Sequence, residues 1–142
     1  MKEEDEIINL IATARHKSHE YLKVLLKETE LDDLNPSDGK VLAILYKHSG
    51  SMEIRDIRNT INRSKSTVTD MVNRLEKLGY VYKKCCSEDK RVVFVNLTEK
   101  AFSLKKSYEI ISKKLLEKSY SNFSQEEKKE FMKLLEKIIS NF

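Results

Sequence analysis

Ser64–Leu97 read SKSTVTDMVNRLEKLGYVYKKCCSEDKRVVFVNL, a pattern in which an amphipathic helix runs directly into a hairpin with a charged tip. The apolar residues of the first half recur at helical spacing and predict one buried face: Val68, Met71, Val72, Leu75 and Leu78. Ser64 is a good N-cap and Gly79 a good helix terminator. We therefore expect a helix from Ser64 to Leu78 followed by a hairpin, which is the order found in a winged helix-turn-helix.

The opposite side of this helix carries short hydroxyl and amide side chains, where an ordinary solvated face is dominated by Lys and Glu. Its members are Ser66, Thr69, Asp70, Asn73 and Lys77, with Arg74 at the margin. Such side chains reach base edges and phosphates in a DNA major groove, so the strip is predicted to read DNA; the alternative is an ordinary solvated face. Asp70 fits least well, because a carboxylate facing DNA either accepts from a cytosine amine or repels phosphate. Lys77 lies far from the helix start and suits phosphate or water better than a base.

The second half of the stretch predicts two strands, Tyr80–Cys85 and Val92–Leu97, joined by polar residues. Its arms and tip are basic, through Lys83, Lys84, Lys90 and Arg91. A narrow minor groove attracts an inserted arginine, so Arg91 is predicted to enter one, oriented by the carboxylate of Asp89. The alternative for Arg91 is a surface ion pair with Glu88 or Asp89.

The composition favours long helices over a loop-rich or sandwich fold. The chain has 142 residues, 35% of them charged and 39% hydrophobic, with 3 Gly and 1 Pro. We expect a mainly α-helical fold with a small β-hairpin wing, of α+β type. No apolar run reaches the ~18 residues of a membrane span, and Met1–Glu6 is too acidic to begin a secretory signal. Neighbouring Cys85 and Cys86 provide no disulfide framework, so a reducing, cytoplasmic location without membrane contact is expected.

Positive charge is concentrated in the middle of the chain. Residues 1–39 carry 5 basic and 10 acidic side chains, residues 40–97 carry 12 and 6, and residues 98–142 carry 10 and 7. The basic excess therefore coincides with the predicted DNA-reading region, as an electrostatic footprint for nucleic acid requires.

Helices are also predicted on both sides of this region. Before it we expect a helix over Glu4–Leu26 and a second helix that is capped by Asn35, has Pro36 at its first position and ends near His48. Gly50 and Ser51 break this second helix, and a short third helix carries Ile54, Ile57 and Ile61. After the hairpin we expect one long helix, capped by Thr98 and ending near Asn122, and a last helix opened by the capping box Ser124–Glu127. The helix-turn-helix proper then covers about Glu53–Leu78. We expect residues 35–98 to form the DNA-binding region and residues 1–34 and 99–142 to form a helical dimerisation region.

The terminal helices carry more apolar surface than one copy of the chain is able to cover. Pairing with a second copy would bury this surface. A two-fold homodimer would also place two recognition helices about 34 Å apart, one DNA turn, and so read a pseudo-palindrome.

The order of helices, the S-x-S-T-V-T helix ending R-L-E-K-L-G-Y-V, the E-D-K-R wing and the following V-N-L-T-E-K resemble the MarR family of bacterial transcriptional regulators. The resemblance covers essentially the whole chain and is strongest over Ser64–Lys100. It implies a homodimer whose first, fifth and sixth helices interlock, with recognition helices in major grooves and wings in minor grooves. By position it implies DNA contacts from Ser64, Ser66, Thr67, Thr69, Asn73 and Arg74, and a wing-tip pair of Asp89 and Arg91. The chain departs from the family pattern at Lys65, Lys90 and Ala101, where Pro, Arg and Gly are common; Lys65 adds a phosphate-binding charge.

Cysteine and histidine provide no clear metal site, and no cofactor is expected. Cys85 and Cys86 invite a redox or metal interpretation, but two thiolates do not complete a zinc site, so a plain structural role is favoured. His16, His19 and His48 lack a partnering carboxylate or thiolate motif, so they are interpreted as partly exposed histidines rather than ligands. Tyr21, Tyr46 and Tyr108 are interpreted as core or rim residues.

No nucleophile with a base, carboxylate pair or metal set appears at a usable spacing, so an enzyme is not expected. The expected function is that of a homodimeric, sequence-specific regulator of transcription that binds double-stranded DNA, acts as a repressor and is released by a small-molecule effector. The alternative is a helical protein–protein interaction module that does not bind DNA; steep salt dependence of DNA affinity would separate the two.

Overall fold

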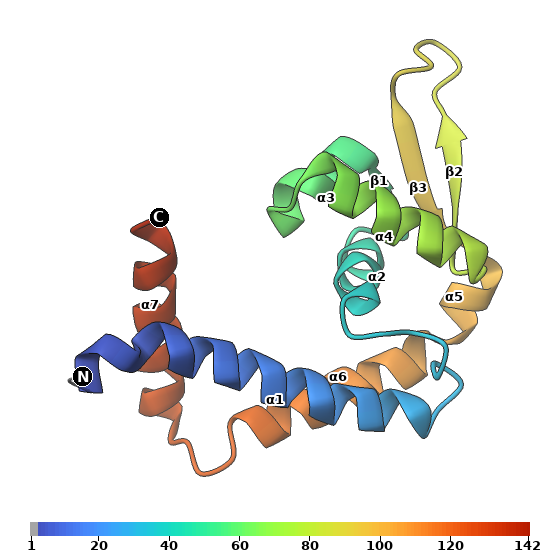
Figure 1. Cartoon of the computed structure of the whole chain (residues 1–142). Helices are drawn as coiled ribbons and strands as arrows, with labels where there is room; N and C mark the ends of the chain where they lie inside the picture. Colours follow the sequence, from blue (N-terminus) through green and yellow to red (C-terminus); the bar gives the residue numbers. More distant parts are fainter. Residues whose placement is uncertain (1–2) are drawn as a thin grey trace.

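The structure is a computed structural model that describes residues 3–142. Figure 1 shows a base formed by two long helices, a lobe that carries the sheet, and one helix that rises at the far end of the base. In chain order the elements are η1 (Glu3–Glu6), α1 (Ile7–Lys27), α2 (Asp38–Lys47), β1 (Ser51–Glu53), α3 (Ile54–Ile61), α4 (Lys65–Lys77), β2 (Val81–Cys85), β3 (Val93–Leu97), α5 (Glu99–Ser103), α6 (Lys105–Ser119) and α7 (Gln125–Ser140). The mainly helical fold with a small β wing is confirmed.

The core lies in the lobe, where α2, α3, α4 and the sheet meet. Many of its fully buried side chains are those that the helical and strand periodicities predict, among them Val41, Leu42, Leu45, Ile57, Val68, Val72, Leu75 and Val95. Each such side chain stabilises the fold by about 1.5–3 kcal/mol relative to an exposed position. The lobe is therefore a rigid support for the exposed side of α4.

The ends of α4 agree with the prediction. The Ser64 hydroxyl accepts a hydrogen bond from the Thr67 N–H at 3.2 Å, so Ser64 is the N-cap. Gly79 follows the helix with a φ of 86°, a left-handed conformation that costs glycine little. The chain can then turn back into β2 at once.

The wing contains one strand more than the sequence predicts. The sheet has the order β1-β3-β2, with both pairings antiparallel. β1 pairs Ser51 with Asn96 and Glu53 with Phe94. The predicted break after the second helix is present, since α2 ends at Lys47 and Gly50 has a positive φ. The strand β1 was not predicted, because a strand of three residues shows no periodicity and exists only through its pairing with β3.

The single long helix predicted from Thr98 to Asn122 is wrong. Thr98 caps it as predicted, but the chain divides into α5 and α6 at Leu104. The carbonyl of Ala101 accepts from the Leu104 N–H at 3.2 Å and from the Tyr46 hydroxyl at 2.6 Å. In a continuous helix that carbonyl would accept from residue 105, so the tertiary hydrogen bond from Tyr46 accompanies the break.

The start of α2 differs slightly from the prediction. The helix begins at Asp38, with Ser37 rather than Asn35 at the N-cap position. Asn35 nevertheless caps the first turn, because its side-chain oxygen accepts from the Asp38 N–H at 3.1 Å and its own N–H donates to the Asp38 carboxylate at 2.9 Å. Pro36 is therefore part of the turn before the helix.

The terminal helices form the base and its far end. Helix α6 packs along α1, and α7 crosses the end of this pair away from the lobe (Figure 1). The predicted capping box of Ser124 and Glu127 is present at the start of α7. Among the helices described, none is long and apolar enough to cross a membrane.

Candidate nucleic-acid interface

The N-terminal turn of α4 carries a connected set of hydroxyl groups. The Ser64 hydroxyl donates to the Thr67 hydroxyl at 2.9 Å and lies 3.3 Å from that of Ser66. Ser64, Lys65, Ser66, Thr69 and Asp70 line one shallow hollow on the exposed side of the helix. Because N–H groups at a helix start carry partial positive charge, the hydroxyls and Lys65 surround a point suited to a phosphate.

Asn73 lies further along the same helix and is bound to the wing. Its side-chain oxygen accepts from the Lys83 ammonium at 2.7 Å. Lys83 also forms an ion pair with Glu76 at 3.5 Å, and its N–H donates to that carboxylate at 3.3 Å. Lys83 therefore fixes β2 to α4, and the Asn73 side-chain oxygen is engaged in this contact.

Arg74 points toward the body of the lobe. Its Nε donates to the Asp38 carboxylate at 3.1 Å, and its Nη2 donates to the Asp33 carbonyl at 3.1 Å. Asp38 is only 1% exposed, whereas the Arg74 side chain is 46% exposed. The guanidinium thus ties α4 to the linker of residues 28–37 that joins α1 and α2.

A second contact joins the same linker to the end of α4. The hydroxyl of the fully buried Tyr80 donates to Asp33 at 2.6 Å, and burial together with this hydrogen bond raises the pKa of Tyr80. Lys100 lies 4.4 Å from the centre of the Tyr80 ring, donates to the Leu78 carbonyl at 2.8 Å and approaches Asp33 at 3.7 Å. The linker therefore holds α4 at two points.

Sequence reasoning missed the roles of Asp33 and Asp38. Asp38 had one local signal, because an Asn followed three residues later by a carboxylate is the spacing of a reciprocal cap. Its partner Arg74 lies 36 positions away, and Asp33 lies 47 positions from Tyr80. Neither partner follows from local spacing.

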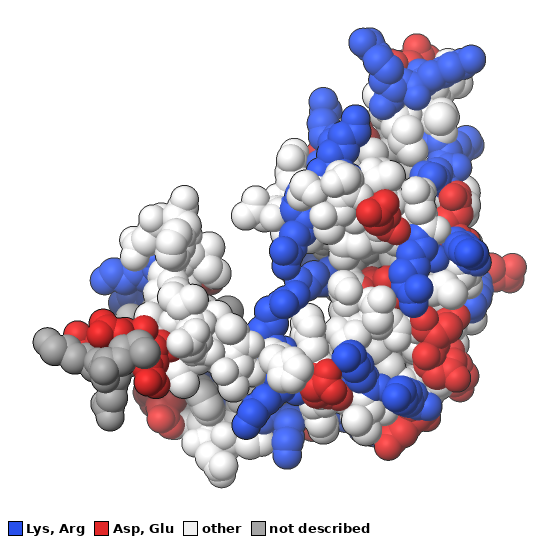
Figure 2. Space-filling view, viewed as in Figure 1, with Lys and Arg blue, Asp and Glu red and all other residues white. Residues whose placement is uncertain are grey.

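The wing tip has the expected pair. The Asp89 carboxylate accepts from the backbone N–H of Arg91 at 2.9 Å, from its Nε at 3.1 Å and from its Nη2 at 3.3 Å. These hydrogen bonds lower the pKa of Asp89. The Arg91 side chain is 92% exposed, and Lys84 and Lys90 are exposed as well. Figure 2 shows lysine and arginine side chains gathered at the tip of the wing and along the edge of the lobe.

Of the other candidate residues, the two cysteines lie on the wing and the tyrosines lie against the core. Cys85 is exposed and Cys86 half-buried, both with free thiols. Over residues 3–142, His, Cys, Asp and Glu form no group of three that would hold a metal ion. Tyr46 and Tyr108 pack against the core with ring centres 5.0 Å apart, and burial raises the pKa of Tyr46 to about 12. Tyr21 also packs against the core.

Comparison with known proteins agrees with this geometry. The model of the MarR family matches residues 34–93, which run from the end of the linker through the wing. That segment of the chain is similar to the MarR family. The chain is also 28% identical, over 92% of its length and 93% of the relative's, to the uncharacterized HTH-type transcriptional regulator YwhA of Bacillus subtilis. Since its relatives are transcriptional regulators, the chain is not an enzyme.

Two solved structures share the fold of the chain. One is a mutant MarR from E. coli complexed with operator DNA, at a TM-score of 0.81 and 21% identity, covering 97% of this chain and 99% of that one. The other is the organohalide-sensing regulator RdhR in its 2,4-dichlorophenol-bound form, at a TM-score of 0.88 and 23% identity, covering 99% of this chain and 82% of that one. The winged helix with flanking helices is thus a known arrangement.

Proposed function

We propose that this chain is a sequence-specific regulator of transcription that binds double-stranded DNA and represses by occupying its operator. The observation that carries the proposal is the exposed N-terminal side of α4, where capped helix, linked hydroxyls and Lys65 meet in one hollow. The basic wing supports it, because Arg91 is held in position and almost fully exposed. The operator complex of the MarR protein with the same fold lends further support. A protein that binds chromosomal DNA in a bacterium works in the cytoplasm.

The residues divide by the group that each one reaches. Ser66, Thr69 and Asn73 are proposed to contact base edges in the major groove, and Ser64, Lys65 and Thr67 to contact phosphate. In the wing, Arg91 enters the minor groove, Asp89 positions it, and Lys84 and Lys90 contact phosphate. Lys83 and Arg74 are proposed to act mainly by positioning α4, since their charges are already engaged by Glu76 and Asp38.

We further propose a homodimer formed by the helices of residues 1–34 and 99–142, with residues 35–98 as the DNA-binding region. Helix α7 supports this proposal most strongly, because none of its 16 residues is buried in the single chain. Large apolar side chains are exposed on α1, α6 and α7, among them Leu10 at 57%, Leu116 at 58% and Leu134 at 48%. A second copy with the same apolar faces would cover them and place the two α4 helices about one DNA turn apart.

An effector is proposed to act between the dimerisation helices and the lobes. Binding there would favour a spacing of the two α4 helices that no longer fits one DNA turn, which is a shift in population between two arrangements. A hollow of about 330 Å³ between α1, α2 and α4 supports this location.

Selection of bound sites from random duplexes tests the DNA-binding proposal. We expect a pseudo-palindrome whose half-sites are about one helical turn, ~10 base pairs, apart. Affinity for the selected site should fall steeply as salt rises, by a slope of about −0.9 per phosphate contacted. Recovery of no common sequence, together with affinity that does not respond to salt, would favour the alternative of a helical protein-interaction module.

A further inference from the structure

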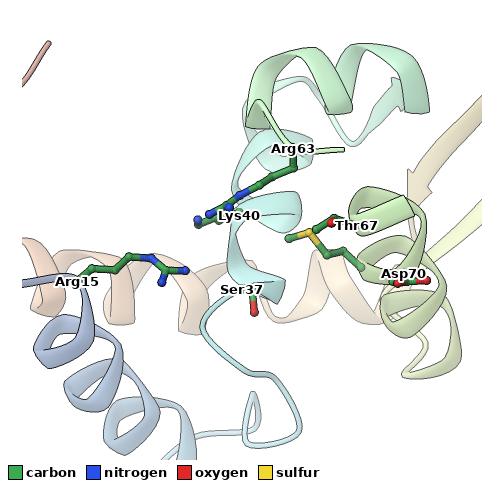
Figure 3. Close-up of a pocket in the computed structure, with 7 residues that line it drawn as sticks. Arg15, Ser37, Lys40, Arg63, Thr67 and Asp70 are labelled. Carbon is green, nitrogen blue, oxygen red and sulfur yellow. The ribbon is translucent and has the colours of Figure 1, made fainter. Parts of the chain in front are cut away.

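Helix α4 is joined to the base of the molecule at one end and separated from it at the other. Beside its N-terminal half lies the hollow between α1, α2 and α4, with Arg15 of α1, Lys40 of α2 and Thr67 of α4 among its lining residues (Figure 3). After the C-terminal end of α4, the chain passes through β2 and β3 and returns as α5, which continues at Leu104 into the base helix α6. The contact between α5 and the end of α4 is therefore the place where the base is able to fix the direction of α4.

One side chain of α5, Lys100, connects this end of α4 to the linker of residues 28–37. Its ammonium donates to the carbonyl of Leu78, the C-cap of α4, at 2.8 Å. The same group lies 3.7 Å from the Asp33 carboxylate of the linker and 4.4 Å from the centre of the Tyr80 ring. An ammonium has three donors, and a cation at the C-terminal end of a helix is stabilised by the partial negative charge of the free carbonyls. Lys100 therefore has a partner for each of its donors at this junction.

The partners of Lys100 are themselves held by the fold. Tyr80 is fully buried, and its hydroxyl donates to Asp33 at 2.6 Å. The hydroxyl of Thr98, the N-cap of α5, donates to the Gly79 carbonyl at 2.6 Å. The Lys100 side chain is 45% exposed, so its ion pair with Asp33 contributes little to stability by itself. What the contact determines is the relative position of α5, the linker and the end of α4.

A small rotation at this junction moves the opposite end of α4, the end assigned to base contacts, by a distance that matters on DNA. The 13 residues of α4 span about 20 Å along the helix axis. A tilt of about 10° around the C-terminal end displaces the N-terminal turn by about 3.5 Å. Consecutive nucleotides of one DNA strand are ~3.4 Å apart along the duplex axis. Such a tilt therefore changes the position of the reading end by about one base pair.

We propose that Lys100 is a positioning residue that sets the spacing of the two α4 helices in the dimer, by fixing the C-terminal end of α4 to α5 and hence to α6. Lys100 itself contacts neither base nor phosphate in this role. The inference rests on the DNA-binding homodimer proposed above, because a distance between half-sites has meaning only for a dimer on DNA. It adds to that function a residue outside the recognition helix and the wing that controls the operator spacing the protein accepts.

Operators of altered spacing test this role. The half-sites selected by the wild type are placed at their selected separation and with one base pair added or removed, and dissociation constants are measured in a shift assay. We expect the wild type to bind each altered operator about tenfold or more weakly, and Lys100→Met to reduce this penalty to about threefold or less. Lys100→Arg, which keeps the charge and the donors, should retain the wild-type penalty. Lys47→Met, a change of an exposed lysine at the end of α2, is the matched control and should also retain it.

Two further measurements separate positioning from a general structural role. On a single half-site, Lys100→Met should bind within about twofold of the wild type, and its urea unfolding midpoint should stay close, since it loses no DNA contact and only a partly exposed ion pair. Asp33→Asn takes away the charge that faces the ammonium but keeps an acceptor for Tyr80, so it should reduce the spacing penalty as well. This second variant carries the test if Lys100→Met does not fold.

The outcomes distinguish the role of Lys100 from the function on which it rests. A wild-type spacing penalty in Lys100→Met, or in Asp33→Asn if the first variant does not fold, would overturn the role of Lys100 alone. An equal reduction of the penalty in Lys100→Arg or in Lys47→Met would assign the effect to something other than this contact and also overturn it. A wild type that binds no operator, or binds without preference for spacing, would instead refute the proposed DNA-binding dimer, and the spacing role with it.

Discussion

At the scale of single residues, the Arg91 side chain is oriented by hydrogen bonds within the wing tip. Asp89 orients its guanidinium through two side-chain hydrogen bonds, yet the Arg91 side chain remains 92% exposed. We expect Arg91→Ala to weaken operator binding by about 1–3 kcal/mol, chiefly at AT-rich flanks where the minor groove is narrow. An electrophoretic shift assay on sites that differ only in their flanks measures this. Asp89→Asn is the companion variant, and it should lose less because the charge of Arg91 remains; unchanged affinity in Arg91→Ala would remove the wing from the interface.

Asn73 carries a prediction of a different kind, because it is expected to select a base rather than to supply charge. Its oxygen is engaged by Lys83, so in the proposed complex its N–H donors are the groups that it offers to a base, and these favour an acceptor. We expect Asn73→Ala to relax preference at one operator position by about 1–3 kcal/mol. Site selection with the wild type and the variant makes the comparison. An identical consensus from both proteins would refute the assignment.

At the scale of elements, the attachment of α4 to the linker depends on a buried charge. Arg74→Met would leave the carboxylate of Asp38, which is 1% exposed, with the backbone N–H of Asn35 as its remaining hydrogen-bond donor in the described structure. We expect the free energy of unfolding to fall by about 2–3 kcal/mol in Arg74→Met and by about 1 kcal/mol in Asp38→Asn, which keeps a neutral acceptor.

Urea unfolding of both variants and of their combination measures this coupling, and the double variant should lose less than the sum of the two. DNA binding by the same variants tests whether Arg74 supports α4 or contacts phosphate. If Arg74→Met unfolds like the wild type but loses DNA affinity and salt dependence, the guanidinium is a phosphate contact instead of a support for α4.

The turn between α2 and β1 shows a second element-level constraint. Gly50 has a φ of 89°, and a Cβ atom there would lie 2.5 Å from the Phe102 ring. Gly39 has open space around its Cα and lies in the first turn of α2. We expect Gly50→Ala to lower the free energy of unfolding by about 1–3 kcal/mol and Gly39→Ala to raise it by about 0.4–1 kcal/mol. Thermal unfolding of the pair checks both signs; equal stability of the two variants would contradict the strain at Gly50.

At the scale of the whole molecule, the terminal helices leave large apolar side chains exposed in the single chain. We expect the wild type to be a dimer in light scattering at micromolar concentration, and Leu134→Lys to shift it toward monomer, because a charge on the apolar side of α7 loses its hydration when the interface closes. Phe94→Ser removes another exposed apolar side chain, on β3, and should leave the mass unchanged. A wild-type monomer under these conditions would overturn the dimer.

Local sequence signals determined much of this molecule. The caps at Ser64, Thr98 and Ser124, the left-handed Gly79 and the periodic apolar faces depend on groups within a few residues of one another, so they could be predicted. The wing-tip pair of Asp89 and Arg91 is equally local. For the same reason, most of the predicted contact residues lie exposed where the sequence places them, at the start of α4 and on the wing.

Tertiary structure alone decided the remainder. The third strand exists through pairing across more than 40 positions, the break at Leu104 accompanies a hydrogen bond from Tyr46 that spans 55, and Arg74 turns toward a carboxylate 36 positions away. The cluster of Arg15, Lys40 and Arg63 likewise gathers side chains from three separate elements around one hollow. The physical reason is common to all four. Hydrogen bonding and burial between distant segments depend on where the folded chain places them, and periodicity and spacing carry no record of that placement.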